Sequence, residues 1–337
     1  MNNKIEQTNI KNIDWNNIVT LNDIVKIVGQ ITIPNKNKAE EVIENIRRIV
    51  RDYVKNNKLQ SLVLGVSGGL DSSVIAALCQ EKYTGVPLIG ISIPMSSSTA
   101  HKEQAQWIGD NYCSAFEEFT GWDDEYFPDG ESEAYNCPTN VMNDVFETTT
   151  MTDKLAEQAG FKVDNFPKNI LQGNIKARLR MITLYDLARK TNGLVLSTDN
   201  LSEFQMGFWT LCGDVGNISP IQNIGKGFEL PVIADTLNIR KDIITQAPSD
   251  GLMVTDENTD EAQLGGNYKE VDSIMNVYLN TLPIAKENIS QLRKSLFSLV
   301  EIDIEGAKKV SKIISRYEAL TFKRNGTVEL QREEIGI

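Results

Sequence analysis

The clearest chemistry in this sequence lies in one short loop between an apolar strand and an apolar helix. The stretch LVLGVSGGLDSSVIAAL, residues 62–78, breaks at Ser67 into small residues and resumes as an apolar helix after Asp71. Glycines let a backbone approach an anion closely, and hydroxyls add donors to the unpaired N–H groups at a helix N-terminus. Residues 67–73 are therefore expected to bind phosphate.

An acid inside a phosphate-binding loop repels its ligand unless a divalent cation lies between them. We therefore predict that Asp71 is a Mg²⁺ ligand. The sequence contains neither GxxxxGK[ST] nor GxGxxG, so Walker A kinase and Rossmann dehydrogenase interpretations lack their main support. The simpler alternative is a Ser- or Asp-capped helix that follows a tight glycine turn and binds nothing.

Strands and helices alternate around this loop. An amphipathic helix is predicted from Ala39 to Val54, a second strand in VPLIGISIP, a helix at 174–190, and a further strand in GLVLST. This alternation predicts an α/β fold with a doubly wound parallel sheet and helices on both faces. Because ligands sit beyond the C-terminal ends of such strands, Glu203, just after GLVLST, could face the same crevice as Asp71. The alternative for Glu203 is a solvated acid in the first turn of a helix.

Composition divides the chain into one main domain with additions. Residues 1–38 are Asn- and Lys-rich and are predicted to be an N-terminal extension with some structure. Residues 39–325 form the expected domain, and residues 117–150, acidic and without clear periodicity, are predicted to be an irregular insertion. Residues 326–337 are expected to be a C-terminal tail.

Composition also limits the class of partner and compartment. Lys and Arg total 34 against 46 Asp and Glu, a formal charge of −12, which is the wrong sign for a nucleic-acid surface. The four cysteines form no CxxC pair, which argues against structural zinc and for reduced thiols. The N-terminus lacks a signal-peptide apolar region, and no apolar run could span a bilayer. We expect a cytoplasmic protein without nucleic-acid or membrane partners.

The loop closely resembles the SGGxDS pyrophosphate-binding signature of the ATP pyrophosphatases, which transfer AMP. Four later stretches occur in the order and rough spacing of ammonia-dependent NAD synthetase: NIKARLRM (174–181), LSTDNLSEFQMGFWTLCGD (196–214), APSDGL (247–252) and TDEAQLGGNY (259–268). The resemblance covers about residues 39–325. It implies an adenine-nucleotide α-hydrolase-like fold, and a reaction in which ATP adenylates deamido-NAD and ammonia then displaces AMP, giving NAD, AMP and pyrophosphate.

The resemblance also implies roles for individual residues. ATP would be held by the phosphate loop and three later side chains: Ser67, Gly68, Gly69, Leu70, Asp71, Ser72, Ser73, Thr198, Lys226 and Ser249. Asp71 and Glu203 would bind Mg²⁺, and Asp71 and Lys226 would be catalytic. Deamido-NAD would contact Arg178, Asn217 and Lys323. Without the resemblance, Lys226 would be taken as a surface lysine in a Gly-rich loop, and Arg178 as an ordinary helix-face arginine.

Three positions differ from the family pattern. Leu211 stands where a lysine is usual, Asn217 where an aspartate is usual, and Phe322 where a histidine is usual. All three belong to the dinucleotide side of the site. A related amide synthetase acting on another carboxylate therefore stays open, as does a nucleotide-binding relative without catalysis.

The resemblance implies a homodimer, and the nitrogen source is expected to be free ammonia or a separate donor protein. No cysteine has the neighbouring histidine that a glutaminase nucleophile needs, and 38 residues are too few for a glutaminase domain. His101, the single histidine, is expected to be solvated or to cap a helix rather than to act as a base.

Overall fold

The computed structural model describes residues 18–94, 99–119, 151–160, 162, 168–248 and 260–326. Four predicted features lie wholly or partly outside these residues. They are Ser249, residues 1–17 of the extension, residues 120–150 of the insertion and residues 327–337 of the tail.

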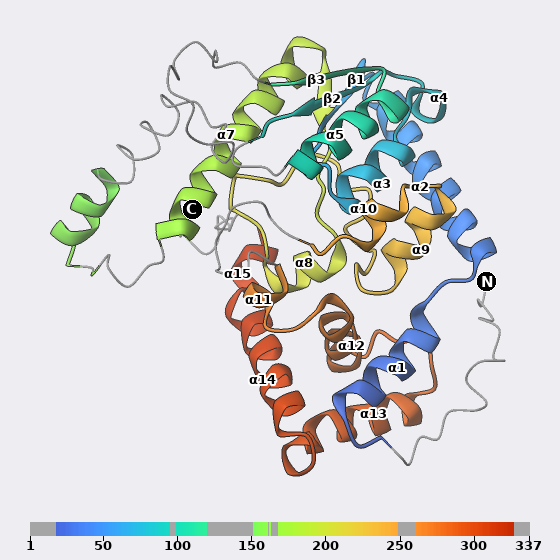
Figure 1. Ribbon diagram of the computed structural model, residues 1–337, viewed down its shortest axis with the longest axis vertical. Helices are drawn as coiled ribbons and strands as arrows, with labels where there is room; N and C mark the ends of the chain where they lie inside the picture. The colour runs from blue at the N-terminus through green and yellow to red at the C-terminus, as the bar shows by residue number, and fades with distance from the viewer. Residues whose placement is uncertain are drawn as a thin grey trace, which may run out of the picture.

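A parallel sheet organises the first part of the described chain (Figure 1). Its strands lie in the order β3-β2-β1-β4, with bounds Ser61–Gly65 for β1, Leu88–Ser92 for β2, Ala115–Glu118 for β3 and Gly193–Val195 for β4. β1 pairs with β2 through Leu62↔Leu88 and with β4 through Val63↔Val195. The chain therefore moves outward from β1 to β3 and then returns to the other side of β1. This reversal confirms the predicted doubly wound sheet.

Helices cover both faces of the sheet because β1 is apolar on both. Leu62 and Leu64 pack into one core with the helices α2 (Lys36–Asn56), α3 (Leu70–Leu78), α5 (Thr99–Tyr112), α9 (Glu229–Thr236) and α10 (Lys241–Thr245). Val63 points the other way and packs with Met181 and Leu184 of α7 (Lys168–Lys190). A strand buried on both faces reads as a continuous apolar run, as SLVLG does.

A second core is built from helices alone and lies at the end of the molecule away from the sheet (Figure 1). It joins α1 (Leu21–Thr32), α12 (Tyr268–Leu279), α13 (Lys286–Ser298), η4 (Leu299–Glu301) and α14 (Ile304–Ala319). Met206, at the end of α8 (Leu201–Met206), is buried in this core. Three short helices are α4 (Glu81–Thr84), α11 (Asp260–Leu264) and α15 (Thr321–Arg324). None of the helices in the described residues has the length and apolar character that a bilayer crossing needs.

The N-terminal extension contributes helix α1. The Thr20 side chain accepts from Asp23 N, and Thr20 N donates to Asp23 Oδ2, so a capping box starts the helix. Its buried face packs on α12 and α13. Gly29 lies directly against Phe228, since a Cβ on Gly29 would sit 2.9 Å from the Phe228 ring.

The first two residues of the predicted irregular insertion belong to a strand. Glu117 and Glu118 are the last residues of β3 and pair with Ile91 and Ser92 of β2. Edge strands often carry charged side chains, which discourage pairing with a further strand. The sequence analysis did not predict β3, because the acids at 117–118 also suit an irregular acidic segment.

The contact of α1 with Phe228 leads to a stability prediction. Gly29→Val should lower the free energy of unfolding by about 1–3 kcal/mol, because the added side chain overpacks the space against the Phe228 ring. Gln30→Val is the matched control: the neighbouring position is exposed, so its change should stay within about 0.5 kcal/mol. Urea denaturation measures both variants. Equal losses would show that α1 is loosely packed on Phe228.

Candidate active site

A pocket of about 690 Å³ opens beyond the C-terminal ends of the strands, where the strand order reverses. The segments after β1, β2 and β4 each line it, through Ser67, Pro94 and Thr198 among others. In doubly wound sheets the loops on either side of the reversal diverge to opposite faces, and this leaves a crevice between them. The predicted phosphate loop and the residues after GLVLST therefore meet at one site.

The phosphate loop has the backbone that close approach to an anion requires. Gly68 has a φ of 85°, and a Cβ there would sit 2.2 Å from the His101 carbonyl oxygen, so a side chain is excluded on two grounds. Gly69 is the N-cap of α3, and no side chain caps the helix. The Ser or Asp cap that the simpler alternative predicted is therefore absent at α3, whose first turn faces the pocket.

The three hydroxyls of the loop divide between two tasks. Ser67 and Ser72 line the pocket, and their Oγ atoms lie 3.1 Å apart. Ser73 is fully buried, and its Oγ donates to the Gly69 carbonyl oxygen over 2.8 Å. Ser72 Oγ also donates to the Gly69 carbonyl oxygen, over 3.0 Å, so Ser72 and Ser73 both stabilise the turn, while Ser67 and Ser72 line the space that a ligand would enter.

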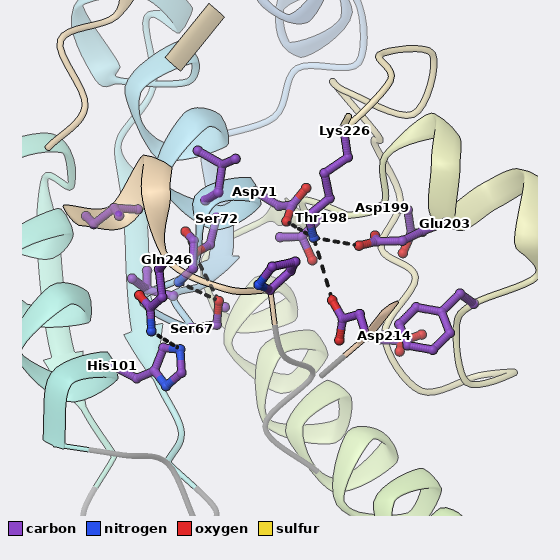
Figure 2. Close-up of a pocket in the computed structure, with 18 of the residues that line it drawn as sticks. Ser67, Asp71, Ser72, His101, Thr198, Asp199, Glu203, Asp214, Lys226 and Gln246 are labelled. Atoms are coloured by element: carbon purple, nitrogen blue, oxygen red, sulfur yellow. Dashed lines mark hydrogen bonds and ion pairs between the residues drawn. The ribbon is translucent and has the colours of Figure 1, made fainter. Parts of the chain in front are cut away.

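Asp71, Glu203 and Lys226 converge at the centre of the pocket (Figure 2). Lys226 Nζ lies 2.9 Å from Asp71 Oδ2 and 2.9 Å from Glu203 Oε1. Asp71 comes from the first turn of α3, and Glu203 from the first turn of α8. Asn200 joins the two helices, since its Nδ2 donates to Asp71 Oδ1 over 2.8 Å and its Oδ1 accepts from Glu203 N over 3.0 Å.

Two further residues complete this cluster, and the sequence analysis assigned them no role. Asp260 Oδ2 lies 3.9 Å from Lys226 Nζ and 2.9 Å from the Tyr268 hydroxyl. The same hydroxyl lies 3.1 Å from Glu203 Oε1, and Lys226 Nζ lies 4.5 Å from the centre of the Tyr268 ring. Both residues stand in TDEAQLGGNY, so their place in a family stretch was the only available signal.

The electrostatics of the cluster follow from three carboxylates around one ammonium in a buried place. Burial raises the pKa of Glu203, and the Asp71 and Asp260 carboxylates add to this, while the Lys226 ammonium opposes it. For Lys226, burial acts to lower the pKa, but the surrounding carboxylates outweigh burial and raise it. The lysine therefore remains a cation at every physiological pH.

The loop that carries Lys226 is held by buried acids of two helices. Gly227 N donates to Asp272 Oδ2 over 2.9 Å, and Gly225 N donates to Glu229 Oε2 over 2.7 Å. Ser202 links the loop to α8 and α12, because its Oγ accepts from Lys226 N over 2.9 Å and donates to Asp272 Oδ1. Asp272 lies one helical turn beyond Tyr268 on α12, so one helix supports both the lysine backbone and its side chain.

The three predicted contacts of deamido-NAD do not line the pocket, and each is bonded to backbone in this structure. Arg178 Nε donates to the Leu211 carbonyl oxygen over 3.2 Å. Asn217 Oδ1 accepts from Val195 N over 3.2 Å and so extends the edge of β4. Lys323 Nζ donates to the carbonyl oxygens of Gly207, over 2.8 Å, and Trp209.

Two more carboxylates that the sequence analysis did not assign line another part of the pocket. Asp199 accepts from Ser197 Oγ over 2.8 Å, and burial raises its pKa to about 6. Asp214 accepts from Thr210 N over 2.9 Å, and burial and the charge of Asp199 raise its pKa to about 7. Asp199 comes shortly after β4, and Asp214 is the last residue of the GFWTLCGD stretch. Their positions in the sequence were the only sign that they lie near the site.

The environment of His101 differs from the expectation that this residue is solvated or caps a helix. It lines the pocket at the start of α5, and its Nε2 lies 2.9 Å from Gln246 Nε2 (Figure 2). Burial lowers the pKa of the imidazole. It thus tethers α5 to the segment that precedes residue 249.

The residues present fit a bound Mg²⁺. Asp71 and Glu203 direct one oxygen each at a common point, which the Lys226 ammonium occupies. Within the described residues, no three His, Cys, Asp or Glu side chains are arranged to hold a metal by themselves. The pair of carboxylates from Asp71 and Glu203 suits Mg²⁺, which usually takes one or two carboxylates and completes its coordination shell with phosphate oxygens and water.

The buried Asp272 leads to a prediction of pH dependence. Burial, together with the nearby Glu229, outweighs three hydrogen bonds and raises the pKa of Asp272 from 3.8 to about 7. Between these values the folded protein keeps a proton that the unfolded chain loses, so this contribution to stability is present below 3.8 and is lost as the pH rises through about 7. Asp272→Asn should therefore gain about 2 kcal/mol relative to the wild-type protein between pH 5 and pH 8.

Urea denaturation at the two pH values measures this difference, and Asp303→Asn is the control. The pKa of Asp303 is lowered by backbone hydrogen bonds from Leu21 and Gly306. Its stabilising effect is present above 3.8 and is lost only at lower pH, so this variant should keep a constant difference from the wild-type protein between pH 5 and pH 8. If the stability difference between Asp272→Asn and the wild-type protein also stayed constant from pH 5 to pH 8, the raised pKa of Asp272 would be contradicted.

Comparisons with known proteins show the family to which the chain belongs. A model of the NAD synthase family matches residues 42–117 and 135–326. An NH(3)-dependent NAD(+) synthetase of Alkaliphilus oremlandii is 30% identical over 240 residues, which cover 70% of this chain and 86% of that protein. A second, from Methanocaldococcus jannaschii, is 29% identical over 241 residues, or 71% and 81% of the two chains.

Solved structures agree on the fold. The NMN synthetase from Francisella tularensis superposes with a TM-score of 0.58 at 22% identity, over 87% of this chain and 98% of that one. The NAD+ synthetase from Burkholderia pseudomallei superposes with a TM-score of 0.53 at 20% identity, over 82% and 92% of the chains. The expected α/β fold is thus confirmed by both topology and likeness. The chain belongs to the NAD synthase family, and on that basis it is an ATP-binding ligase of NAD biosynthesis.

Proposed function

We propose that this protein amidates deamido-NAD with ammonia at the expense of ATP, and that it releases AMP and pyrophosphate. In the first step, the nicotinate carboxylate attacks the α-phosphorus of ATP, and the bond to pyrophosphate breaks. In the second, ammonia attacks the acyl carbon, the bond to AMP breaks, and the nitrogen loses a proton. The observation that carries the proposal is the convergence of Asp71, Glu203 and Lys226 beside the first turn of α3.

The phosphate end of ATP is assigned to the loop at residues 67–73. The first turn of α3 offers N–H groups to an anion, and the Ser67 and Ser72 hydroxyls stand beside it. Thr198 lines the same pocket after β4. Lys226 carries a fixed positive charge that can compensate negative charge on the phosphates as pyrophosphate departs. Ser249 keeps its proposed contact with ATP from the sequence resemblance.

Asp71 and Glu203 are the proposed Mg²⁺ ligands. The metal, when bound, would neutralise charge on the α-phosphorus and on the leaving pyrophosphate. Neighbouring residues hold the two carboxylates in place. Asn200 orients Asp71 and caps α8, while Tyr268 contacts Glu203. Both carboxylates are thereby held before the ligand arrives, which lowers the cost of organising the site.

The dinucleotide end is assigned to Arg178, Asn217 and Lys323, with support from the sequence resemblance. Arg178 is exposed and follows Ala177, which lines the pocket. All three side chains hold backbone hydrogen bonds here, so substrate binding through them would exchange those bonds for contacts with substrate. We further propose a homodimer in the cytoplasm that takes ammonia from solution or from a separate donor, with the domain at residues 39–325.

A direct assay tests this function. Purified protein with ATP, Mg²⁺, ammonium and deamido-NAD should form NAD and pyrophosphate in equal amounts. Asp71→Asn should reduce kcat/KM by about a hundredfold or more, because a preorganised charge at the reacting phosphates is lost. Asp52→Asn, an exposed acid of α2 paired with Arg48, should leave it unchanged.

The carboxylate substrate is tested in the same assay with nicotinate mononucleotide in place of deamido-NAD. A higher kcat/KM with the mononucleotide would overturn the proposed substrate and would favour a related amide synthetase. ATP binding without pyrophosphate release under any of these conditions would favour a non-catalytic relative.

A further inference from the structure

The Lys226 ammonium lies between the two carboxylates that are proposed to hold the metal. Its Nζ is 2.9 Å from Asp71 Oδ2 and 2.9 Å from Glu203 Oε1. The three side chains are 9%, 16% and 13% exposed, respectively. Mg²⁺ binds oxygen ligands at roughly 2.0–2.1 Å, so movement of the two carboxylates by about 1 Å would convert an ammonium site into a metal site.

The ammonium is fixed at this point from several directions. The Tyr268 ring lies beneath it, with 4.5 Å from Nζ to the ring centre, and the Tyr268 hydroxyl is 3.4 Å away. Asp260 Oδ2 approaches to 3.9 Å. The Lys226 backbone is tied by its N–H to Ser202 Oγ, which donates in turn to Asp272. These contacts hold the lysine in the carboxylate cluster in the absence of ligand.

The charges of the cluster determine what can displace the ammonium. A free divalent cation entering between Asp71 and Glu203 would meet the positive charge of Lys226 at contact distance in a poorly screened place. A nucleotide triphosphate changes this balance, because its phosphates offer the ammonium another anion beside the first turn of α3. The lysine can then release the carboxylates to a metal that arrives with the phosphates.

We propose that Lys226 excludes free divalent metal from the Asp71–Glu203 pair, so that the site accepts the metal only as its nucleotide complex. This assignment rests on the proposed function, since it takes Asp71 and Glu203 as the metal ligands. It makes Lys226 a specificity-determining residue for the form in which the metal binds, in addition to its proposed contact with ATP.

Calorimetric titration of the nucleotide-free protein with Mn²⁺, which shares the oxygen ligands of Mg²⁺, tests the exclusion. Lys226→Met should bind free Mn²⁺ about tenfold more tightly or better than the wild-type protein, because an opposing charge is removed. The same variant should bind the metal–ATP complex more weakly. Lys269→Met is the matched control: it removes an exposed cation from the lining of the same pocket, and should leave the affinity for free Mn²⁺ within about twofold.

Lys226→Gln guards against misfolding, because Met would remove the donor that Asp71 Oδ2 and Glu203 Oε1 share, whereas the glutamine amide can still donate to them. It should show the same gain in affinity for Mn²⁺, and adding Asp71→Asn should abolish the gain. An unchanged affinity in Lys226→Gln would overturn the inference.

The NAD assay on the wild-type protein separates the two proposals. NAD formation without a gain in Mn²⁺ affinity in Lys226→Gln overturns the exclusion alone. A gain that depends on Asp71, in a protein that makes no NAD, supports the exclusion and overturns the proposed substrate.

Discussion

The site depends on one buried ammonium held among three carboxylates. Charges removed from water are stable only when they are paired and hydrogen-bonded, and Lys226, Asp71, Glu203 and Asp260 satisfy this by converging within one pocket. The requirement constrains four separate segments of the chain at once. The turn after β1, helix α8 after β4, the loop at 225–227 and the start of α11 must all meet. The parallel sheet provides the common edge at which the first two can do so.

The helical layer supports the cluster from the side opposite the sheet. Tyr268 and Asp272 lie one turn apart on α12, so one face of that helix contacts the Lys226 side chain and its neighbouring backbone. Helix α1 packs on α12, and Gly29 abuts Phe228, two residues after Lys226. The described part of the N-terminal extension thus belongs to the support of the site, although the family match begins at residue 42.

The two ends of the site are organised differently. At the phosphate end, Gly69, Ser67 and Asp71 present donors and charge that the chain's own turns and caps already orient. At the proposed dinucleotide end, Arg178 and Lys323 are bonded to backbone carbonyls of the segment 207–211. That segment begins at the αL residue Gly207, which ends α8. Any ligand that binds there has to compete with these bonds, whereas phosphate meets groups whose positions already suit it.

The sequence by itself determined the local features. Apolar runs such as SLVLG indicate strands that are buried on both faces, and small residues followed by an acid indicate a phosphate loop, because both patterns arise from neighbouring residues. The approximate places of β1, β2 and β4, the turn at 67–73 and the acid at Asp71 were predictable for this reason. Family resemblance supplied Lys226 and the metal-binding role of Glu203. Strand β3 was not predicted, because Glu117 and Glu118 suit an acidic loop as well as an edge strand.

Only the tertiary structure decided which distant side chains meet. Asp260 and Tyr268 lie far along the chain from Asp71, and nothing in their local pattern distinguishes them from a helix-capping acid and a core tyrosine. Asn217 shows the converse: its side chain is used by the edge of β4 and does not line the pocket. Long-range pairing of buried charges depends on how the sheet and the helical layer dock, and this docking is a property of the whole fold rather than of any window of sequence.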